Sequence, residues 1–292
     1  MPVPPKGPIT DSPIVRAAGL LDRALRRRMA TDLRGAIGRG ELTLHYQPRI
    51  RLADGRRNGA EALLRWHHAA RGAVPPAAFI PVAEGSDLIV EIGGWALRRA
   101  AAEAALHPEL GRVSVNISAR QLAAGVLPAQ VDLALADSGL APERLELELT
   151  ESLPLAEGTR VAAMLGALRG RGIGLALDDF GTGYASFARL RRLPFNTLKL
   201  DRSLVAPLPG QPADLAILRA IRDLGRAMQL RLVAEGVETP AQQALLAELG
   251  FEEAQGFRFG GPMPLAMLLA QDCGAATCQP AAGAAPAPRG MA

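Results

Sequence analysis

The chain has 292 residues, of which 49% are apolar and 21% charged, and its formal net charge is +4. This length suits one large domain or two small ones with a substantial core. No apolar run approaches the roughly 18 residues of a membrane span, and the first residues lack the pattern of a secretory signal. Both cysteines, Cys273 and Cys278, lie in an Ala/Pro-rich end, which excludes a disulfide framework and a cysteine-based zinc site. We therefore expect a cytoplasmic globular protein without a membrane segment.

Composition and periodicity divide the chain into four segments. The Pro-rich residues 1–15 and the Ala/Pro-rich residues 273–292 are expected to be disordered. Residues 16–40 are expected to be helical, because apolar residues recur at helical spacing from Leu25 to Ile37. Residues 41–272 are expected to form the main domain.

Strand and helix signals alternate through this main domain. Eight turn-bounded segments resemble strands, in chain order Leu42–Pro48, Gly59–Arg65, Arg112–Ile117, Arg144–Thr150, Gly172–Asp179, Thr197–Asp201, Leu230–Glu235 and Phe251–Gln255. Helical patterns separate most of them, at Trp95–Leu106, Leu127–Ala136, Gly158–Arg169, Ala213–Met228 and Pro240–Leu249. An Asp54-Gly55 turn joins the first two strands, which predicts an antiparallel hairpin.

This alternation predicts an α/β fold, a TIM-like (β/α)8 barrel whose first strand runs antiparallel to the rest. An open, doubly wound sheet is the alternative. The sequence after Asp179 gives that alternative no support, because its glycines do not complete a dinucleotide-binding fingerprint.

Polar residues follow a regular pattern within the predicted strands. Val113 and Val115 share one face of a strand, whereas Ser114 and Asn116 share the other. Because helices cover the outside of a barrel, the polar faces must point toward its axis. Five strands end in polar residues, which a barrel would gather at its C-terminal mouth, where active sites lie: Asn116, Glu148, Asp178, Lys199 and Glu235.

Carboxylates crowded on one rim repel one another and need a cation. Oxygen donors without cysteine or histidine are the ligands that magnesium or manganese prefers. The adjacent Asp178 and Asp179 could bracket two such ions, an arrangement suited to displacement at phosphorus. Lys199 is the one lysine of the main domain, and it offers a compact amine that can titrate.

The same residues lie in seven ordered motifs: Glu61-Ala62-Leu63-Leu64-Arg65-Trp66, Asn116-Ile117-Ser118, Glu148-Leu149-Thr150-Glu151, Asp178-Asp179-Phe180-Gly181, Leu198-Lys199-Leu200-Asp201, Val233-Ala234-Glu235-Gly236-Val237-Glu238 and Gln255-Gly256. Together, from about Asp32 to Leu269, they resemble the EAL domain family of cyclic di-GMP phosphodiesterases. The resemblance implies metal-dependent hydrolysis of one phosphodiester bond of cyclic di-GMP, which yields linear pGpG.

The resemblance also implies a role for each matched residue. It assigns two Mg²⁺ or Mn²⁺ ions to a set of five ligands, namely Glu61, Asn116, Glu148, Asp178 and Asp179. In the catalytic set, Lys199 and Glu235 would act on the attacking water, and Glu151 would anchor the Asp178-Asp179 loop.

For the substrate, the resemblance implies that Arg65 grips a phosphate and that Gln255 belongs to the site. Gln47, at the end of the first strand, could border the guanine pocket, or its role could be structural. His67 and His68 are interpreted as loop residues rather than metal ligands. A phosphodiesterase of the HD type is excluded, since the chain has no His-Asp dipeptide.

Two departures from the family pattern bear on the rate. Ala185 replaces a usual serine and Asn196 a usual aspartate, and the second change could loosen the loop or a dimer contact that places Asp178 and Asp179. The alternative function is therefore a non-catalytic receptor for cyclic di-GMP or a protein-interaction module.

The family further implies a homodimer, and a separate regulatory protein is a possible partner. A nucleic acid polymer is not expected as a partner, because the arginines are dispersed and aromatic residues make up only 4%.

Overall fold

The computed structural model describes residues 24–150, 158–182 and 187–272. Nine strands of this part form one sheet, in the order β1-β9-β8-β7-β6-β5-β4-β2-β3, and β1 also pairs with β2. That last pairing closes the sheet into an eight-stranded barrel to which β3 is an appendage. The strands are β1 Leu42–Arg51, β2 Arg57–His68, β3 Gly72–Val74, β4 Arg112–Asn116, β5 Leu145–Thr150, β6 Gly174–Phe180, β7 Thr197–Leu200, β8 Arg231–Ala234 and β9 Glu253–Gln255.

The direction of β1 confirms the predicted hairpin. β1 runs antiparallel to both of its neighbours, with Leu44 opposite Leu64 on β2 and Arg49 opposite Gln255 on β9. The other barrel pairings, from β2 to β4 and onward to β9, are parallel. The predicted TIM-like barrel with an antiparallel first strand is therefore confirmed, and the open doubly wound sheet is excluded.

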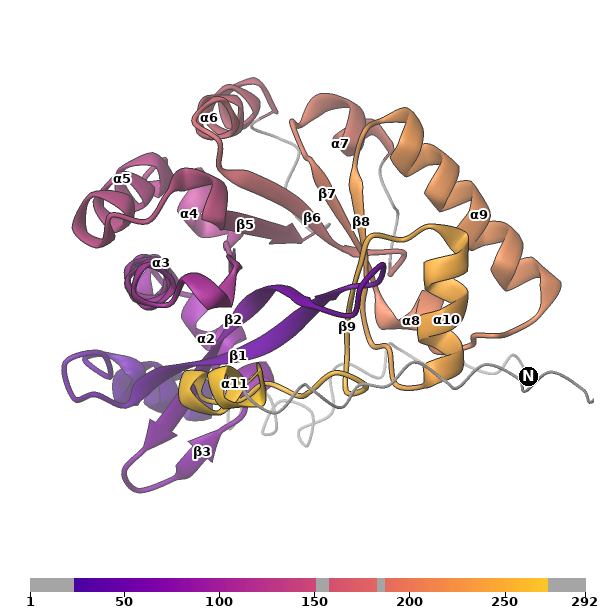
Figure 1. Cartoon of the computed structure of the whole chain (residues 1–292). Helices are drawn as coiled ribbons and strands as arrows, with labels where there is room; N and C mark the ends of the chain where they lie inside the picture. Colours follow the sequence, from indigo (N-terminus) through magenta and orange to yellow (C-terminus); the bar gives the residue numbers. More distant parts are fainter. Residues whose placement is uncertain (1–23, 151–157, 183–186, 273–292) are drawn as a thin grey trace, which may run out of the picture.

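Helices surround the strands (Figure 1). They are a segment over residues 24–33, then α2 Pro76–Glu84, α3 Leu88–Leu106, α4 Ala119–Ala123, α5 Leu127–Ser138, α6 Gly158–Gly170, α7 Phe187–Arg192, α8 Arg202–Val205, α9 Pro212–Ala227, α10 Pro240–Leu249 and α11 Leu265–Asp272, with 3-10 turns at Pro108–Leu110 and Pro142–Arg144. None of the helices in the described part is both long enough and apolar enough to span a bilayer.

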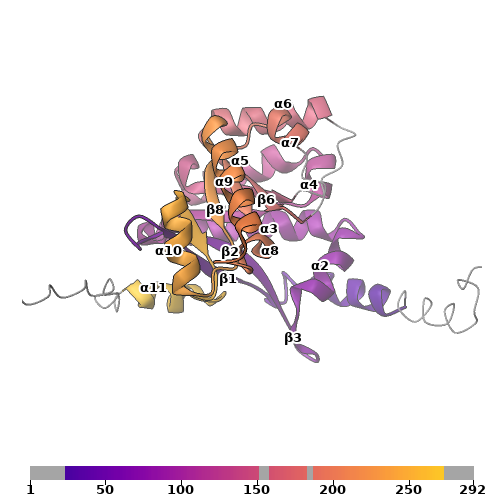
Figure 2. The same cartoon turned by 90° about the vertical axis from the view of Figure 1, so that its right-hand side faces the viewer.

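Six strands or helices were not predicted, namely β3, α2, α4, α7, α8 and α11, and helix α3 begins earlier than expected. The strand β3 has three residues, too few to show an alternating pattern, and it extends away from the ring of helices (Figures 1 and 2). Helix α2 contains Pro81, a residue that normally argues against a helix interior. Helix α3 begins at Leu88 rather than Trp95, and its first turns contain Ile89, Val90 and Ile92, β-branched residues that weaken the helical signal in the sequence.

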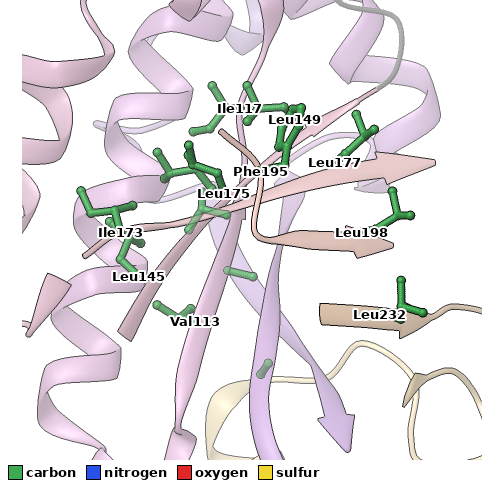
Figure 3. Packing of buried hydrophobic residues seen from close by; sticks show 14 of the residues in the cluster. Val113, Ile117, Leu145, Leu149, Ile173, Leu175, Leu177, Phe195, Leu198 and Leu232 are labelled. Carbon is green, nitrogen blue, oxygen red and sulfur yellow. The ribbon is translucent and has the colours of Figure 1, made fainter. Parts of the chain in front are cut away.

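The main apolar core lies between the strands and the helices, as Figure 3 shows. Outward-facing side chains from five successive parallel strands fill it, with exposures of 0–2%: Val113, Leu145, Leu175, Leu198 and Leu232. Between these positions, polar side chains point to the barrel axis, where Ser114, Glu146 and Lys199 are at most 1% exposed. The predicted division into an apolar outer face and a polar inner face is confirmed.

A second apolar cluster joins the N-terminal segment to the barrel. Leu33 of the first helix packs in a group with Trp66 and Phe79, and Met29 and Ile37 lie against it. Leu25, placed on the same helical face by its spacing, is 53% exposed. Within the predicted helix of residues 16–40, residues 24–33 are helical and 34–40 form turns. Both predicted disordered ends, residues 1–15 and 273–292, lie outside the described residues.

Asn196 joins two strands at the barrel end opposite to the mouth. Its Oδ1 accepts a hydrogen bond from the N–H of Leu175 at 2.7 Å, and its own N–H donates to the Leu175 carbonyl at 3.0 Å. An aspartate oxygen could accept the same bond. The structure thus gives Asn196 a local role in sheet pairing, remote from Asp178 and Asp179, while Ala185 lies outside the described residues.

Gly256 allows the ends of β8 and β9 to meet at the mouth. A Cβ at this position would lie 2.2 Å from the carbonyl oxygen of Val237 and 2.3 Å from its nitrogen. Val237 also donates to the Gln255 carbonyl at 3.1 Å and accepts from the Arg258 N–H at 3.0 Å. No side chain fits between segments that are hydrogen-bonded so closely.

We predict that Gly256→Ala lowers the free energy of unfolding by about 1–3 kcal/mol, the usual cost of overpacking. Thermal unfolding followed by circular dichroism measures the change. Gly170→Ala at the end of α6 is the control, since nothing lies within 4 Å of a Cβ there. Equal unfolding midpoints for the two variants would contradict the packing argument.

Candidate metal centre and active site

The barrel mouth brings together one polar side chain from each of seven consecutive barrel strands or the residue that follows it. They are Glu61 on β2, Asn116 on β4, Glu148 on β5, Asp178 on β6, Lys199 on β7, Glu235 after β8 and Gln255 on β9. The strand-end pattern predicted that five of these residues would meet here, whereas Glu61 and Gln255 were expected at the site only from the family resemblance.

The ammonium of Lys199 lies at the centre of the cluster. Nζ is 2.7 Å from Glu148 Oε2 and 2.7 Å from Glu235 Oε1. It is also 3.1 Å from Asp178 Oδ1 and 3.5 Å from Glu61 Oε2. Four carboxylates therefore share a single buried ammonium, and the cluster carries an excess of negative charge.

This crowding perturbs the proton affinities of the cluster. Burial and the neighbouring carboxylates raise the pKa of Glu148 well above its ordinary value and that of Glu235 to about 8. Although burial opposes it, Lys199 together with two amide donors lowers the pKa of Glu61. Burial would also lower the pKa of Lys199, but the surrounding carboxylates raise it well above its usual range.

Divalent cations bound beside Lys199 would lower its pKa. Cations at these carboxylates would act against the raising effect that the carboxylates exert. Buried carboxylates with raised pKa values exchange protons for a metal ion, because the ion needs the deprotonated form.

The acidic side chains fall into two groups that could each hold an ion. Carboxylate oxygens of Glu61, Glu148 and Asp178 lie within 4.8 Å of one another, and so do those of Asp178, Asp179 and Glu235. Asp178 belongs to both groups. The buried Glu148 Oε1 accepts no hydrogen bond from any described residue, which leaves it free to bind a cation. The oxygen-only donor set fits a hard divalent ion such as magnesium or manganese.

A bulge in β6 lets two consecutive aspartates serve one site. In a regular strand the side chains of Asp178 and Asp179 would point to opposite faces. The pairing with β7 shifts register between Leu177 and Phe180, and Asp179 adopts a left-handed backbone with φ of 59°. The Asp179 N–H then donates to Asp178 Oδ1 at 2.9 Å. Burial and the nearby Asp178 raise the pKa of Asp179.

Amide side chains orient Glu61 from both sides. Asn116 Nδ2 donates to Glu61 Oε1 and Gln255 Nε2 donates to Glu61 Oε2, both at 2.7 Å. Gln255 Nε2 is also 3.0 Å from Gln47 Oε1, and Gln47 in turn donates to the Gly260 carbonyl at 3.2 Å. The structure thus links Gln47 and Gln255 to the acidic cluster through hydrogen bonds.

A cavity of about 600 Å³ adjoins the cluster between the strand ends and helices α2, α3 and α4. Arg65, Asn116 and Asp179 line its polar part, and Ile80 and Ile92 contribute to its apolar part. A ligand with both a charged group and a flat apolar ring would find complementary walls here.

The two predicted loop histidines do not enter the cluster. Neither histidine belongs to an acidic group, and His68 Nδ1 accepts the backbone N–H groups of Ala70 and Arg71. The expected loop position was wrong, because His67 and His68 are the last residues of β2 and pair with Ala73 and Gly72 of β3. Glu151 lies outside the described residues.

The sequence analysis did not single out Arg49 or Glu253, which lie beneath the cluster, each 1% exposed. The predicted first strand ended at Pro48. In a longer strand, Arg49 lies two residues after Gln47 and therefore on the same inner face. This alternation of side chains along the strand was the sequence feature that could have identified Arg49.

Comparison with known proteins agrees with the fold. Residues 30–262 match the EAL domain. The bifunctional diguanylate cyclase/cyclic di-GMP phosphodiesterase MucR of Pseudomonas aeruginosa is 44% identical over 243 residues, which are 82% of this chain and 36% of MucR. The cyclic di-GMP phosphodiesterase NbdA of the same organism is 43% identical over 254 residues, 85% of this chain and 32% of NbdA.

The solved phosphodiesterase of MucR in complex with c-di-GMP superposes with a TM-score of 0.76 at 43% identity, covering 82% of this chain and 99% of that one. The chain spans about a third of the length of the full-length relatives it matches. Because the family match covers most of the chain and the barrel carries the family's motifs at its mouth, the chain belongs to the EAL domain family.

Proposed function

We propose that the chain is a metal-dependent phosphodiesterase that hydrolyses one phosphodiester bond of cyclic di-GMP to give linear pGpG. The observation that carries this proposal is the pair of acidic groups sharing Asp178 beside the buried Lys199. Two related proteins named as cyclic di-GMP phosphodiesterases, at 43–44% identity, support the choice of substrate.

The proposed metal ligands are the predicted ones, with Mg²⁺ or Mn²⁺ as the ions: Glu61, Asn116, Glu148, Asp178 and Asp179. When bound, two such ions would lower the pKa of water and neutralise charge on the phosphate. Asp178 has to serve both ions, since it is common to the two acidic groups.

Protein groups around the cluster have separate tasks in this proposal. Lys199 Nζ holds the attacking water and takes part in its deprotonation, and Glu235 Oε1, 2.7 Å away, keeps Nζ in place and exchanges the proton. Burial raises the pKa of Glu235 to about 8 in the metal-free site, so this group can hold and release a proton near neutral pH. Arg65 binds a phosphate of the substrate through its planar donor fork.

Gln47 and Gln255 belong to the substrate-binding set, with Gln255 also orienting Glu61. Glu151 is proposed to anchor the loop after β5, in support of catalysis. A homodimer, a separate regulatory protein as partner and a cytoplasmic location complete the proposal.

Incubation of the purified chain with cyclic di-GMP and either Mg²⁺ or Mn²⁺ tests the activity, with pGpG separated by chromatography. We expect pGpG only when metal is present and no turnover after chelation. Glu148→Gln should lower the rate at least about a thousandfold, equivalent to about 4 kcal/mol of lost transition-state stabilisation. Binding of cyclic di-GMP without hydrolysis, in the presence of either metal, would instead favour the receptor alternative.

Asp179→Asn tests the need for the second acidic group. Asparagine tolerates the left-handed backbone, so the fold should be retained, but the lost charge should reduce turnover at least about 100-fold. Asp179→Ala should show the same loss of turnover and, in addition, about 1 kcal/mol lower stability. Steady-state rates at saturating metal and thermal unfolding measure the two effects. Wild-type turnover in Asp179→Asn would rule out a role for this carboxylate.

A further inference from the structure

A second layer of charged side chains fills the barrel directly below the mouth. Arg49 and Glu146 are at most 1% exposed, and Glu253 is equally buried. Barrels of this kind are usually filled by branched apolar side chains. Burying charges here is costly unless each is paired, so the layer calls for a function that apolar packing could not supply.

Arg49 connects this lower layer to the mouth. Its Nη1 lies 2.5 Å from Glu146 Oε1 and 3.8 Å from Glu148 Oε1, and its Nε lies 2.7 Å from Glu253 Oε2. Glu146 and Glu148 are two residues apart on β5 and therefore share the inner face. The guanidinium thus reaches across the barrel from β1 and faces both carboxylates of the opposite strand.

Glu146 is held from several other directions. Ser114 Oγ donates to its Oε1 at 3.1 Å and Thr197 Oγ1 donates to its Oε2 at 2.9 Å. These bonds fix Glu146, and through it they fix the guanidinium beneath Glu148. Since Glu148 Oε1 accepts no hydrogen bond from the described residues, Arg49 is the cationic group that faces this oxygen from below.

We infer that Arg49 is a positioning residue for Glu148: its guanidinium, clamped by Glu146 and Glu253, sets the orientation in which Glu148 meets a divalent cation. The inference rests on the proposed metal-dependent function. It requires the planar fork of arginine, because an ammonium could not contact Glu146 and Glu253 with two separate nitrogens.

Arg231 provides a matched control within the same layer. Its Nη2 lies 3.6 Å from Glu146 Oε2 and its Nη1 lies 3.4 Å from Glu253 Oε1. It therefore pairs with the same two carboxylates as Arg49, but none of its described ion pairs involves a carboxylate of the mouth. Although Arg231 is less buried than Arg49, with 19% of its side chain exposed against 1%, it tests whether replacement of any arginine beside Glu146 and Glu253 is enough to change the metal site.

Titration calorimetry of Mn²⁺ into the full chain, without cyclic di-GMP, tests the inference. We expect Arg49→Lys to raise the Kd for Mn²⁺ about 10- to 100-fold, as removal of a group that orients a metal ligand does. Arg231→Lys should keep the Kd for Mn²⁺ within about twofold of the wild type. Glu148→Gln serves as the reference for the loss of Mn²⁺ affinity when the metal ligand itself is removed. Thermal unfolding of each variant shows that the folded chain is being titrated.

Equal effects of Arg49→Lys and Arg231→Lys, or no effect of either, would overturn the inference. If Arg49→Lys does not fold, the double variant Arg49→Met/Glu146→Gln replaces it, because this variant removes both charges of the buried pair. The double variant should show the same rise in Kd for Mn²⁺. Wild-type affinity in the double variant would overturn the inference. A wild-type chain that binds no Mn²⁺ would refute it together with the metal dependence. A chain that binds Mn²⁺ but leaves cyclic di-GMP intact contradicts the proposed activity alone.

Discussion

Burial of charge inside a closed barrel is the constraint on which this structure depends. Eight strands present apolar side chains to the helices and polar side chains to the axis, so the interior contains ionisable groups that water cannot reach. Every such group must find a partner, because an uncompensated buried charge costs several kcal/mol. The arrangement of partners along the barrel axis explains the placement of nearly every functional side chain.

The two layers of the barrel interior differ in how their buried charges are paired. In the lower layer, Glu146 and Glu253 are matched by Arg49 and Arg231, and hydroxyl and amide donors complete the pairing. In the upper layer, four carboxylates surround the single ammonium of Lys199. The lower layer is thus charge-balanced, whereas the upper layer has an affinity for further positive charge. Divalent cations bound at the mouth would neutralise this excess negative charge, and a substrate phosphate could reach them there.

Strand periodicity was sufficient to predict most of this arrangement. The alternation in segments such as Arg112–Asn116 fixed which side chains face the axis, and the strand ends fixed which of them meet at the mouth. Local geometry was not predictable in the same way. The bulge that turns Asp179 toward Asp178 depends on pairing with β7, which a single strand does not reveal. Arg49 was missed because the first strand was predicted to end at Pro48, three residues before its actual end at Arg51. Helix α2 was missed because Pro81 argued against a helix.

The acidic mouth is proposed to bind two divalent cations that share Asp178. Anomalous diffraction from crystals of the chain grown with Mn²⁺ tests it most directly. We expect two manganese peaks at the mouth, one among Glu61, Glu148 and Asp178 and one between Asp178 and Asp179. Manganese bound only elsewhere, with Lys199 still contacting all four carboxylates, would contradict it.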